Sequence, residues 1–317
     1  LLALMASFTA CENGDQAFDD YEGGTTVMFV YQSPVRTIVL GDDEYDTSLD
    51  KEHKCKIKAT FAGSYNGRKG YVNVAVDNSL CDHLTFADGT PVKAMPAEYY
   101  SLSTNKLDFK GGMTGETVVQ LTDAFFNDPD AVKNTYVIPL AMTDQQGFDR
   151  ISAGTLKEGA TGSRTNAAIW ETVPKDYVMY CVKYQNKYSG WWLTHHNTST
   201  DNIEKASKVQ ITTRTLNSSV YSVEFQEGST IYKADLLLTF DANEKCTITS
   251  LTDGVTATGT GSWADDALLS WNNKYRDLME LNAEITFAGG VKKNLNEKLV
   301  WQRSGVTKEE FSFTYNN

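Results

Sequence analysis

Apolar and polar residues alternate in short runs along most of the chain, which is the period of a β-strand with one buried face. The alternation is cleanest over residues 278–287 and is repeated over residues 54–61 and 230–241. No helical pattern longer than two turns is convincing; residues 123–132 and 264–272 come nearest. The pattern therefore predicts an all-β protein.

The first half of the chain contains several such runs, at residues 25–32, 54–61, 70–77, 106–110, 116–122 and 135–143. Asn66-Gly67 is a turn signal and predicts a hairpin between the second run and the third. Pro139 in the last run predicts an edge strand, because proline cannot donate to a sheet. Six to eight short strands with turn residues between them predict a β-sandwich over residues 25–150.

A polar stretch rich in glycine interrupts the pattern at residues 150–175, and we assign residues 151–170 as an interdomain linker. Further strand patterns follow it at 178–184, 209–215, 219–225, 230–241, 246–251, 254–261, 278–287, 298–303 and 311–315. Antiparallel strands joined by short turns predict a lipocalin-like β-barrel over residues 171–317, with a second sandwich as the alternative.

The N-terminal residues have a different character. An apolar run ends in the small residue Ala10 and in Cys11, and an acidic, polar segment follows at once. This order is typical of the end of a bacterial lipoprotein signal, so residues 1–11 are predicted to be signal peptide and lipobox, with Cys11 lipidated. Residues 12–24 are predicted to form a flexible tether. The alternative is a short buried strand or helix.

The net charge and the length of the chain argue against several classes of function. The chain has 317 residues, enough for two domains, a net charge of −12 and no basic run. Such a chain is not expected to bind nucleic acid, or anionic lipid by charge. No stretch reaches the roughly 20 apolar residues of a membrane span, so membrane attachment is expected only through Cys11.

Four cysteines remain if Cys11 is lipidated: Cys55, Cys81, Cys181 and Cys246. Cys55 and Cys246 fall on the apolar faces of predicted strands, where a free thiol behaves as a small hydrophobe. We therefore expect buried free thiols. A disulfide between Cys55 and Cys81 is the alternative that an exported protein allows.

Five segments resemble one family of exported lipoproteins of gut anaerobes: YQSPVRT at 31–37, AVDNSLC at 75–81, MPAEYYSL at 95–102, NTYVIPL at 134–140 and DYVMYCVKY at 176–184. The N-terminal half resembles the immunoglobulin-like domain of unknown function that precedes the catalytic barrel of some family-18 endo-β-N-acetylglucosaminidases. The C-terminal half resembles the lipocalin-like domain that often follows that barrel. The resemblance implies an outer-membrane, surface-exposed lipoprotein of a glycan-utilisation system, with a co-encoded transporter and its glycan-binding lipoprotein as partners.

The densest group of candidate binding residues lies at the start of the second half. It combines aromatic rings that could stack on sugars with side chains that could hydrogen-bond hydroxyl groups: Tyr184, Tyr188, Trp191, Trp192, His196 and Asn197. Trp191 and Trp192 are adjacent, so on a strand they point to opposite faces and only one can be core. The alternative is that the whole cluster is structural.

Metal binding and catalysis find little support in the sequence. His195 and His196 are adjacent and would diverge on a strand, and the acidic run 42–46 lacks the glycine and terminal glutamate of a dedicated calcium loop. Asp265 and Asp266 are neighbours, whereas glycosidase carboxylates face each other across about 5 to 9 Å. We predict no metal, no cofactor and no enzymatic activity.

Taken together, the sequence predicts a lipid-anchored surface protein that binds a glycan of unknown identity. A structural or adhesive lipoprotein that contacts protein partners is the main alternative, and strand addition at an edge such as 135–143 would favour it. An unrecognised hydrolase is the third possibility.

Overall fold

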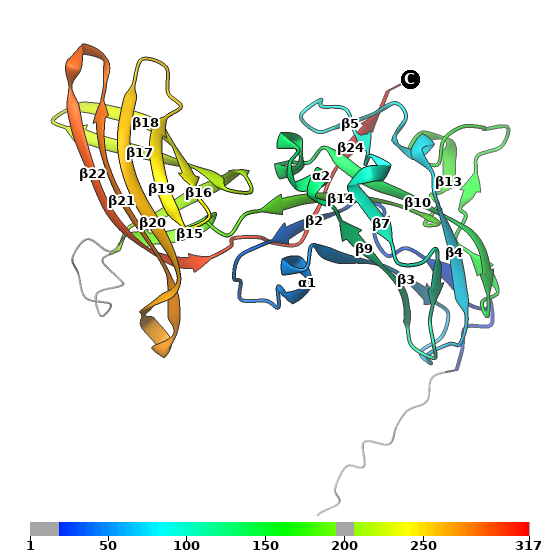
Figure 1. Cartoon of the computed structure of the whole chain (residues 1–317). Coiled ribbons are helices and arrows are strands. Elements are labelled where there is room, and N and C mark those ends of the chain that lie inside the picture. The colour runs from blue at the N-terminus through cyan, green and yellow to red at the C-terminus, as the bar shows by residue number, and fades with distance from the viewer. Residues whose placement is uncertain (1–18, 195–205, 317) are drawn as a thin grey trace, which may run out of the picture.

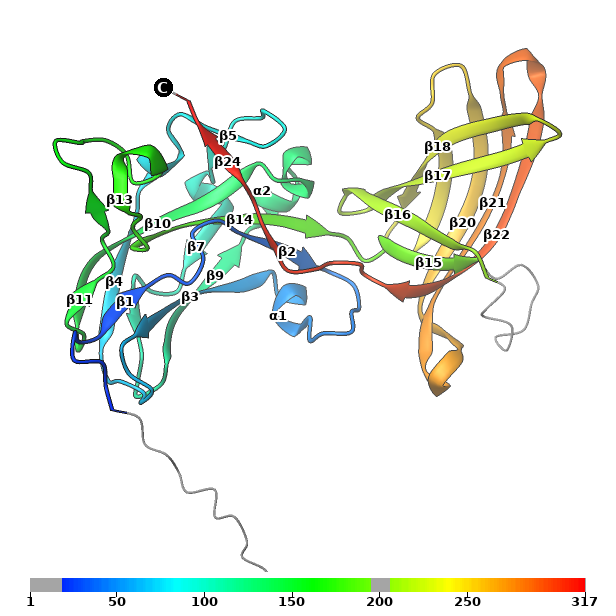
Figure 2. The same cartoon turned by 180° about the vertical axis from the view of Figure 1, so that it is seen from behind.

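The computed structural model describes residues 19–194 and 206–316 and has two parts, a β-sandwich and a β-barrel at one end of it (Figures 1 and 2). Almost all regular structure is strand, which confirms the predicted all-β class. No helix in these ranges is long and apolar enough to cross a membrane.

The sandwich consists of two sheets. The first has the order β11 (Arg150–Ile151), β1 (Thr26–Met28), β3 (Lys54–Ala62), β9 (Thr114–Leu121) and β7 (Tyr100–Leu102). The second has the order β23 (Glu309–Glu310), β2 (Pro34–Val39), β14 (Tyr177–Gln185), β10 (Tyr136–Gln146), β4 (Tyr71–Val76) and β8 (Lys106–Asp108), with β6 (Lys93–Ala94) beside β10.

Smaller elements complete the sandwich. β5 (Leu84–Phe86) pairs with β24 (Phe313–Tyr315), and β12 (Thr155–Leu156) pairs with β13 (Trp170–Thr172). The helices are single turns: α1 (Ser48–Lys51), α2 (Asp123–Phe126), η1 (Asn78–Cys81), η2 (Ala97–Tyr99), η3 (Pro129–Val132) and η4 (Ala167–Ile169).

Alternation along the strands was a reliable guide to burial, but it did not reveal which strands pair. Ile57 and Phe61 on β3 and Val72 and Val74 on β4 are buried in one core, as their period predicts. The predicted hairpin between these strands is wrong, because β3 pairs with β1 and β9 whereas β4 pairs with β10 and β8. The two apolar faces belong to opposite sheets and meet in the core between them.

Pro139 does not mark an edge strand, since β10 is central and pairs with β14 on one side and with β4 on the other. Pairing with β4 ends at Leu140, opposite Val76, and the Pro139 carbonyl accepts from the Asp77 N–H at 2.9 Å. In a strand, the N and the carbonyl of one residue point to the same side. The missing N–H of Pro139 therefore lies just beyond the end of β4, where the ladder requires no donor.

The barrel is closed and antiparallel, with strands in sequence order: β15 (Gly190–Thr194), β16 (Lys208–Thr215), β17 (Ser218–Glu227), β18 (Thr230–Phe240), β19 (Lys245–Ser250), β20 (Thr256–Leu269), β21 (Tyr275–Thr286) and β22 (Lys292–Arg303). Short 3₁₀ turns lie at η6 (Trp271–Asn273) and η7 (Ala288–Gly290). The alternating residues of β21 face inward as predicted, with Leu281 and Ile285 completely buried. The up-and-down order is the one expected for a lipocalin-like barrel.

The two parts are connected at places other than the predicted linker. β14 was expected in the barrel but lies inside the second sheet of the sandwich, and the run at 311–315 returns to the sandwich as β24. The chain crosses to the barrel after β14 and comes back after β22 (Figure 1). The assigned linker, 151–170, instead forms part of the sandwich, where β12 pairs with β13 and Thr165 is buried.

A buried amide holds the first crossing in place. Asn186 is 1% exposed, and its Nδ2 donates to the carbonyls of Thr215 at 2.7 Å and Ser218 at 3.0 Å. Its Oδ1 accepts from the Ser189 hydroxyl at 2.7 Å. The end of the sandwich strand is thereby hydrogen-bonded to the barrel turn between β16 and β17.

All four cysteines of the described chain, Cys55, Cys81, Cys181 and Cys246, are buried free thiols. Burial raises the pKa of each thiol to about 12. This agrees with the preferred sequence interpretation and not with a disulfide between Cys55 and Cys81.

Candidate functional site

The aromatic residues predicted to bind glycan do not form one surface. Tyr184 lies in the sandwich core, where its hydroxyl donates to the Phe126 carbonyl at 3.0 Å. Tyr188 and Trp192 lie in the barrel core, and Trp191 is half-buried with the Lys208 ammonium 4.2 Å from its ring. His196 and Asn197 lie outside the described residues. The predicted division of the two tryptophans is therefore found, but the cluster is largely core.

Tyr188 shows why these rings are structural. It stacks on Phe240 with ring centroids 3.8 Å apart and meets Trp263 edge-on at 5.6 Å. Its hydroxyl donates to Glu244 at 2.7 Å, and its carbonyl accepts from the Trp192 indole at 3.2 Å. These contacts occupy both the ring face and the polar end that a sugar would need.

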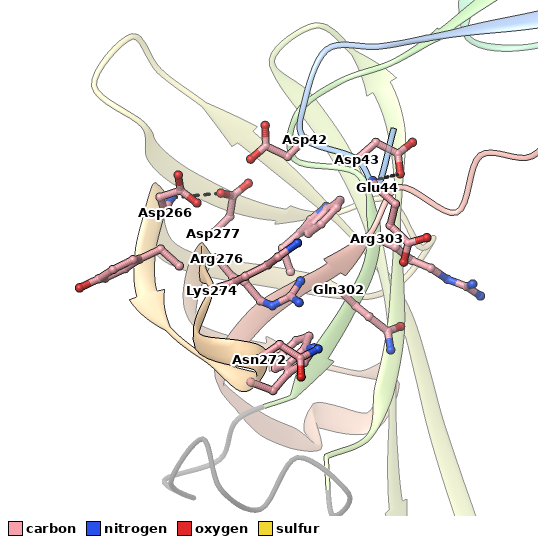
Figure 3. Close-up of a pocket in the computed structure, with 13 residues that line it drawn as sticks. Asp42, Asp43, Glu44, Asp266, Asn272, Lys274, Arg276, Asp277, Gln302 and Arg303 are labelled. Atoms are coloured by element: carbon pink, nitrogen blue, oxygen red, sulfur yellow. Dashed lines mark hydrogen bonds between the residues drawn. The ribbon is translucent and has the colours of Figure 1, made fainter. Parts of the chain in front are cut away.

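A different cleft lies where the sandwich meets the barrel, with a volume of about 530 Å³ (Figure 3). The sandwich contributes the loop after β2, with Asp42, Asp43 and Glu44. The barrel contributes the end of β22 and the turn between β20 and β21, including η6. This volume falls within the range of about 300 to 1,000 Å³ that is usual for small-molecule sites.

Aromatic rings and polar groups share this cleft. The Arg276 guanidinium lies 3.8 Å from the centre of the Trp271 ring, and Tyr275 is 61% exposed. The Gln302 Oε1 and the Arg276 Nε are buried, and neither has a hydrogen-bond partner in the part of the chain that the structure describes. Such atoms are rare in proteins and call for a partner. The cleft therefore contains aromatic side chains, one of them covered on one side by Arg276, together with a buried acceptor and a buried donor that lack partners among the described residues.

Carboxylates gather at one wall of the cleft. Asp42 from the sandwich and Asp265, Asp266 and Asp277 from the barrel each place an oxygen within 4.8 Å of the others. Figure 3 shows three of them, Asp42, Asp266 and Asp277. Asp277 is 3% exposed, and its Oδ1 accepts from the Asp266 N–H at 3.1 Å. The nearby Lys51 ammonium pairs with Asp42 at 2.6 Å. Such a cluster could hold a divalent cation, but acidic residues alone do not identify a metal site, and the absence of a metal stays a prediction.

The cluster changes the acidity of Asp277. Burial, with the neighbouring Asp265 and Asp42 carboxylates, raises the pKa of Asp277 to about 7, although the hydrogen bond from the Asp266 N–H opposes the shift. In the unfolded chain the pKa returns to about 3.8. The folded protein therefore keeps a proton that the unfolded chain releases, and the stability of the fold falls as pH rises from about 4 to about 7.

We expect Asp277→Asn to remove this pH dependence, because an amide keeps the acceptor for the Asp266 N–H but carries no charge. At pH 8 the variant should be more stable than the parent, and at pH 4 the two should be nearly equal. Urea unfolding at the two pH values, with a chelator present to remove divalent cations, measures the difference. A variant that is less stable than the parent at pH 8 would show that the folded protein stabilises the ionised Asp277 carboxylate.

Comparisons with known proteins agree with the two-part architecture. A family model described as a domain of unknown function (DUF5627) matches residues 180–305, and a model described as an N-terminal domain matches residues 20–149. A crystal structure of a protein of unknown function from Bacteroides ovatus is 30% identical with a TM-score of 0.83, covering 94% of this chain and 100% of that chain. This chain belongs to the same family.

The DUF5627 match contains the whole barrel, and the N-terminal match ends close to the end of β10. A second crystal structure, of a multidomain protein including DUF1735 from Bacteroides ovatus, is 12% identical with a TM-score of 0.39, covering 87% of this chain and 91% of that chain. That similarity is too low to support an argument. No curated protein matches the chain.

The cleft combines features that the sequence had shown only separately. The acidic run 42–46 lacks the features of a calcium loop, and Asp265 and Asp266 are adjacent in the sequence, so neither was predicted to form a site. Arg276 and Gln302 were not identified, and nothing in their local sequence marks them. The pairing of β20, β21 and β22 brings the barrel groups together, and the approach of the sandwich loop adds Asp42, Asp43 and Glu44.

Proposed function

We propose that this protein is a non-catalytic, cell-surface lipoprotein of a glycan-utilisation system, and that it binds glycan in the cleft between the sandwich and the barrel. The observation that supports glycan binding is the pairing of a stacking platform, Trp271, with the unpartnered polar atoms of Gln302 and Arg276 in the same cleft. A sugar has apolar C–H faces for the indole and hydroxyl groups that both donate and accept.

The arrangement of the carboxylates supports binding over hydrolysis. A glycosidase needs two carboxyl groups on either side of the scissile bond, about 5 to 9 Å apart. Here Asp42, Asp266 and Asp277, which line the cleft, converge on one point with Asp265, and Asp277 is nearly inaccessible. Carboxylates grouped in this way can accept hydrogen bonds from sugar hydroxyls, but they do not bracket a bond.

The proposed glycan site gives a direct test. Trp271→Ala should weaken binding of the best ligand from a glycan array about tenfold, because one stacking interaction of 1 to 1.5 kcal/mol is lost. Isothermal titration of the parent and the variant measures the change. Trp191→Ala is the matched control, since Trp191 is half-buried on the barrel but does not line the cleft. A larger loss in the control would assign the site to the Trp191 surface instead.

The proposed location depends on Cys11, which lies outside the described residues. The apolar run that ends in Ala10 and Cys11 supports a lipoprotein, and the family resemblance supports its place at the surface of the outer membrane. A co-encoded transporter and its glycan-binding lipoprotein are the proposed partners, and the family resemblance supports them.

In a Gram-negative host, Cys11→Ala is expected to move the protein from the membrane fraction to the soluble fraction without changing its fold. The physical reason is that the thiol is the only group proposed to carry lipid, whereas the first described strand begins at Thr26. Immunoblots of fractionated cells check the outcome, with Cys55→Ser as the control. Retention of the Cys11→Ala protein in the membrane would contradict the lipid anchor.

The alternative of an adhesive protein that contacts protein partners was to be favoured by an unpaired edge strand at 135–143, and that edge is not found. Strand addition needs an unpaired edge, and the segment proposed for this role, 135–143, lies in β10, which is paired on both sides. Glycan binding in the cleft is therefore the function that we propose.

A further inference from the structure

A second cleft, of about 410 Å³, opens on the sandwich and is separate from the one already described. Residues of β13 and η1 line it, and β13 lies on the side of the sandwich that faces away from the barrel (Figures 1 and 2). One wall is formed by the loop between β12 and β13, the segment that the sequence suggested as a linker. Asp176, the residue immediately before β14, also lines the cleft.

Contacts within the segment hold the loop against the sandwich. The Trp170 indole donates to the Ser163 carbonyl at 3.3 Å, and the Ser163 hydroxyl lies 2.8 Å from that of Thr165, which is 3% exposed. The Arg164 Nε donates to the Asp176 Oδ2 at 3.2 Å. The contact between Arg164 and Asp176 therefore joins this loop to the sandwich, and the other contacts hold Ser163 and Trp170 together within it.

Asp176 is the unusual group in this cleft. Its residue is 3% exposed, and its Oδ1 is buried without a hydrogen-bond donor among the described residues. Buried carboxylate oxygens normally accept hydrogen bonds, because desolvation otherwise costs free energy. Burial also raises the pKa of Asp176, and the Arg164 charge opposes that shift only partly. The Oδ1 therefore lacks a donor that a ligand hydroxyl could supply.

The surrounding groups define what such a ligand would look like. In the described chain, Arg164 uses only its Nε, so its terminal nitrogens can still donate. Trp170 is half-buried and presents ring surface, and the His83 and Tyr315 rings lie 5.8 Å apart at another part of the cleft. A ring-shaped ligand with neighbouring hydroxyl groups could donate to Asp176, accept from Arg164 and lie against Trp170.

The charges in the cleft decide between classes of ligand. Asp77, Asp82 and Asp176 carry three carboxylates, whereas Arg164 is the one arginine or lysine in the lining. A phosphate or a uronic acid would meet net negative charge and is disfavoured, whereas a neutral sugar is not. We propose that this cleft is a second binding site, which takes one neutral pyranose unit.

Saturation-transfer NMR can test the proposal with the methyl glycosides of glucose, galactose, mannose and N-acetylglucosamine, and with methyl glucuronide as the anionic probe. We expect at least one neutral glycoside to show saturation transfer, and the glucuronide to show none. Trp170→Ala and Arg164→Ala should each reduce the signal at least about fivefold, since about 1 kcal/mol of binding is lost in each. Thermal melts confirm that both variants are folded.

The interdomain variant Trp271→Ala separates this site from the function proposed above. Signals that belong to the second cleft should persist in Trp271→Ala. If they disappear there, the sugars occupied the interdomain cleft and the second site is wrong. The proposal is also overturned if no neutral glycoside gives a signal, if Trp170→Ala and Arg164→Ala leave the signal unchanged, or if the glucuronide saturates equally well.

Discussion

Trp192→Ala is expected to lower the free energy of unfolding of the barrel by about 3 to 5 kcal/mol, the usual loss for a large aromatic side chain deleted from a core. Trp192 is completely buried in the barrel core, and its indole donates to the Tyr188 carbonyl. Replacement by alanine leaves a cavity in the core and removes the N–H group that donates to the Tyr188 carbonyl. Urea unfolding followed by circular dichroism measures the loss.

Trp191→Ala provides the matched control at the next position of the same strand. Trp191 is half-buried, and the Lys208 ammonium over its ring is worth about 0.5 to 1 kcal/mol at an exposed site. We therefore expect a loss of about 1 kcal/mol for this variant. Equal losses in the two variants would contradict the assignment of one face of β15 to the core.

The second large effect on stability is expected at Phe311, in the segment by which the chain returns from the barrel to the sandwich. Phe311 is 6% exposed and packs edge-on against Phe86 with ring centroids 5.1 Å apart, while its N–H donates to the Ser33 carbonyl at 2.9 Å. Phe311→Ala should therefore destabilise the sandwich, not the barrel from which this segment emerges, by about 3 to 4 kcal/mol. Amide hydrogen exchange read by mass spectrometry can assign the loss to one part.

Increased exchange is expected in β2 and β5, with β18 and β21 unchanged. Ser312→Ala is the control, because Ser312 is exposed and adjacent to Phe311. Faster exchange in the barrel alone would mean that the C-terminal segment contributes nothing to the sandwich. The expected result would show that the two parts are joined by two crossings and are not separable at 151–170.

Strand positions and buried faces could be predicted from the sequence because they depend on local alternation. The inward residues of β3 and β21 follow directly from a period of two. Pairing could not be predicted in this way, since β3 and β4 carry the same pattern but belong to opposite sheets. The position of β14 was missed for the same reason: an apolar strand next to a glycine-rich stretch fits either part equally well.

The binding residues were harder to predict than the strands. In an aromatic cluster such as Tyr188 to Trp192, most of the side chains belong to the core, because large aromatic rings bury much apolar surface. The cleft instead joins Asp42 to Asp277, which are far apart in the chain. Their proximity depends on how the sandwich loop lies against the barrel, and no periodicity in the sequence encodes that contact.

The central claim is that the cleft between the sandwich and the barrel binds glycan, and a crystal structure of the protein with its best array ligand tests it most directly. The account predicts a sugar ring on Trp271, with hydroxyl groups hydrogen-bonded to the Gln302 Oε1 and to Arg276. A sugar bound on the Trp191 surface, with the interdomain cleft empty, would contradict the claim.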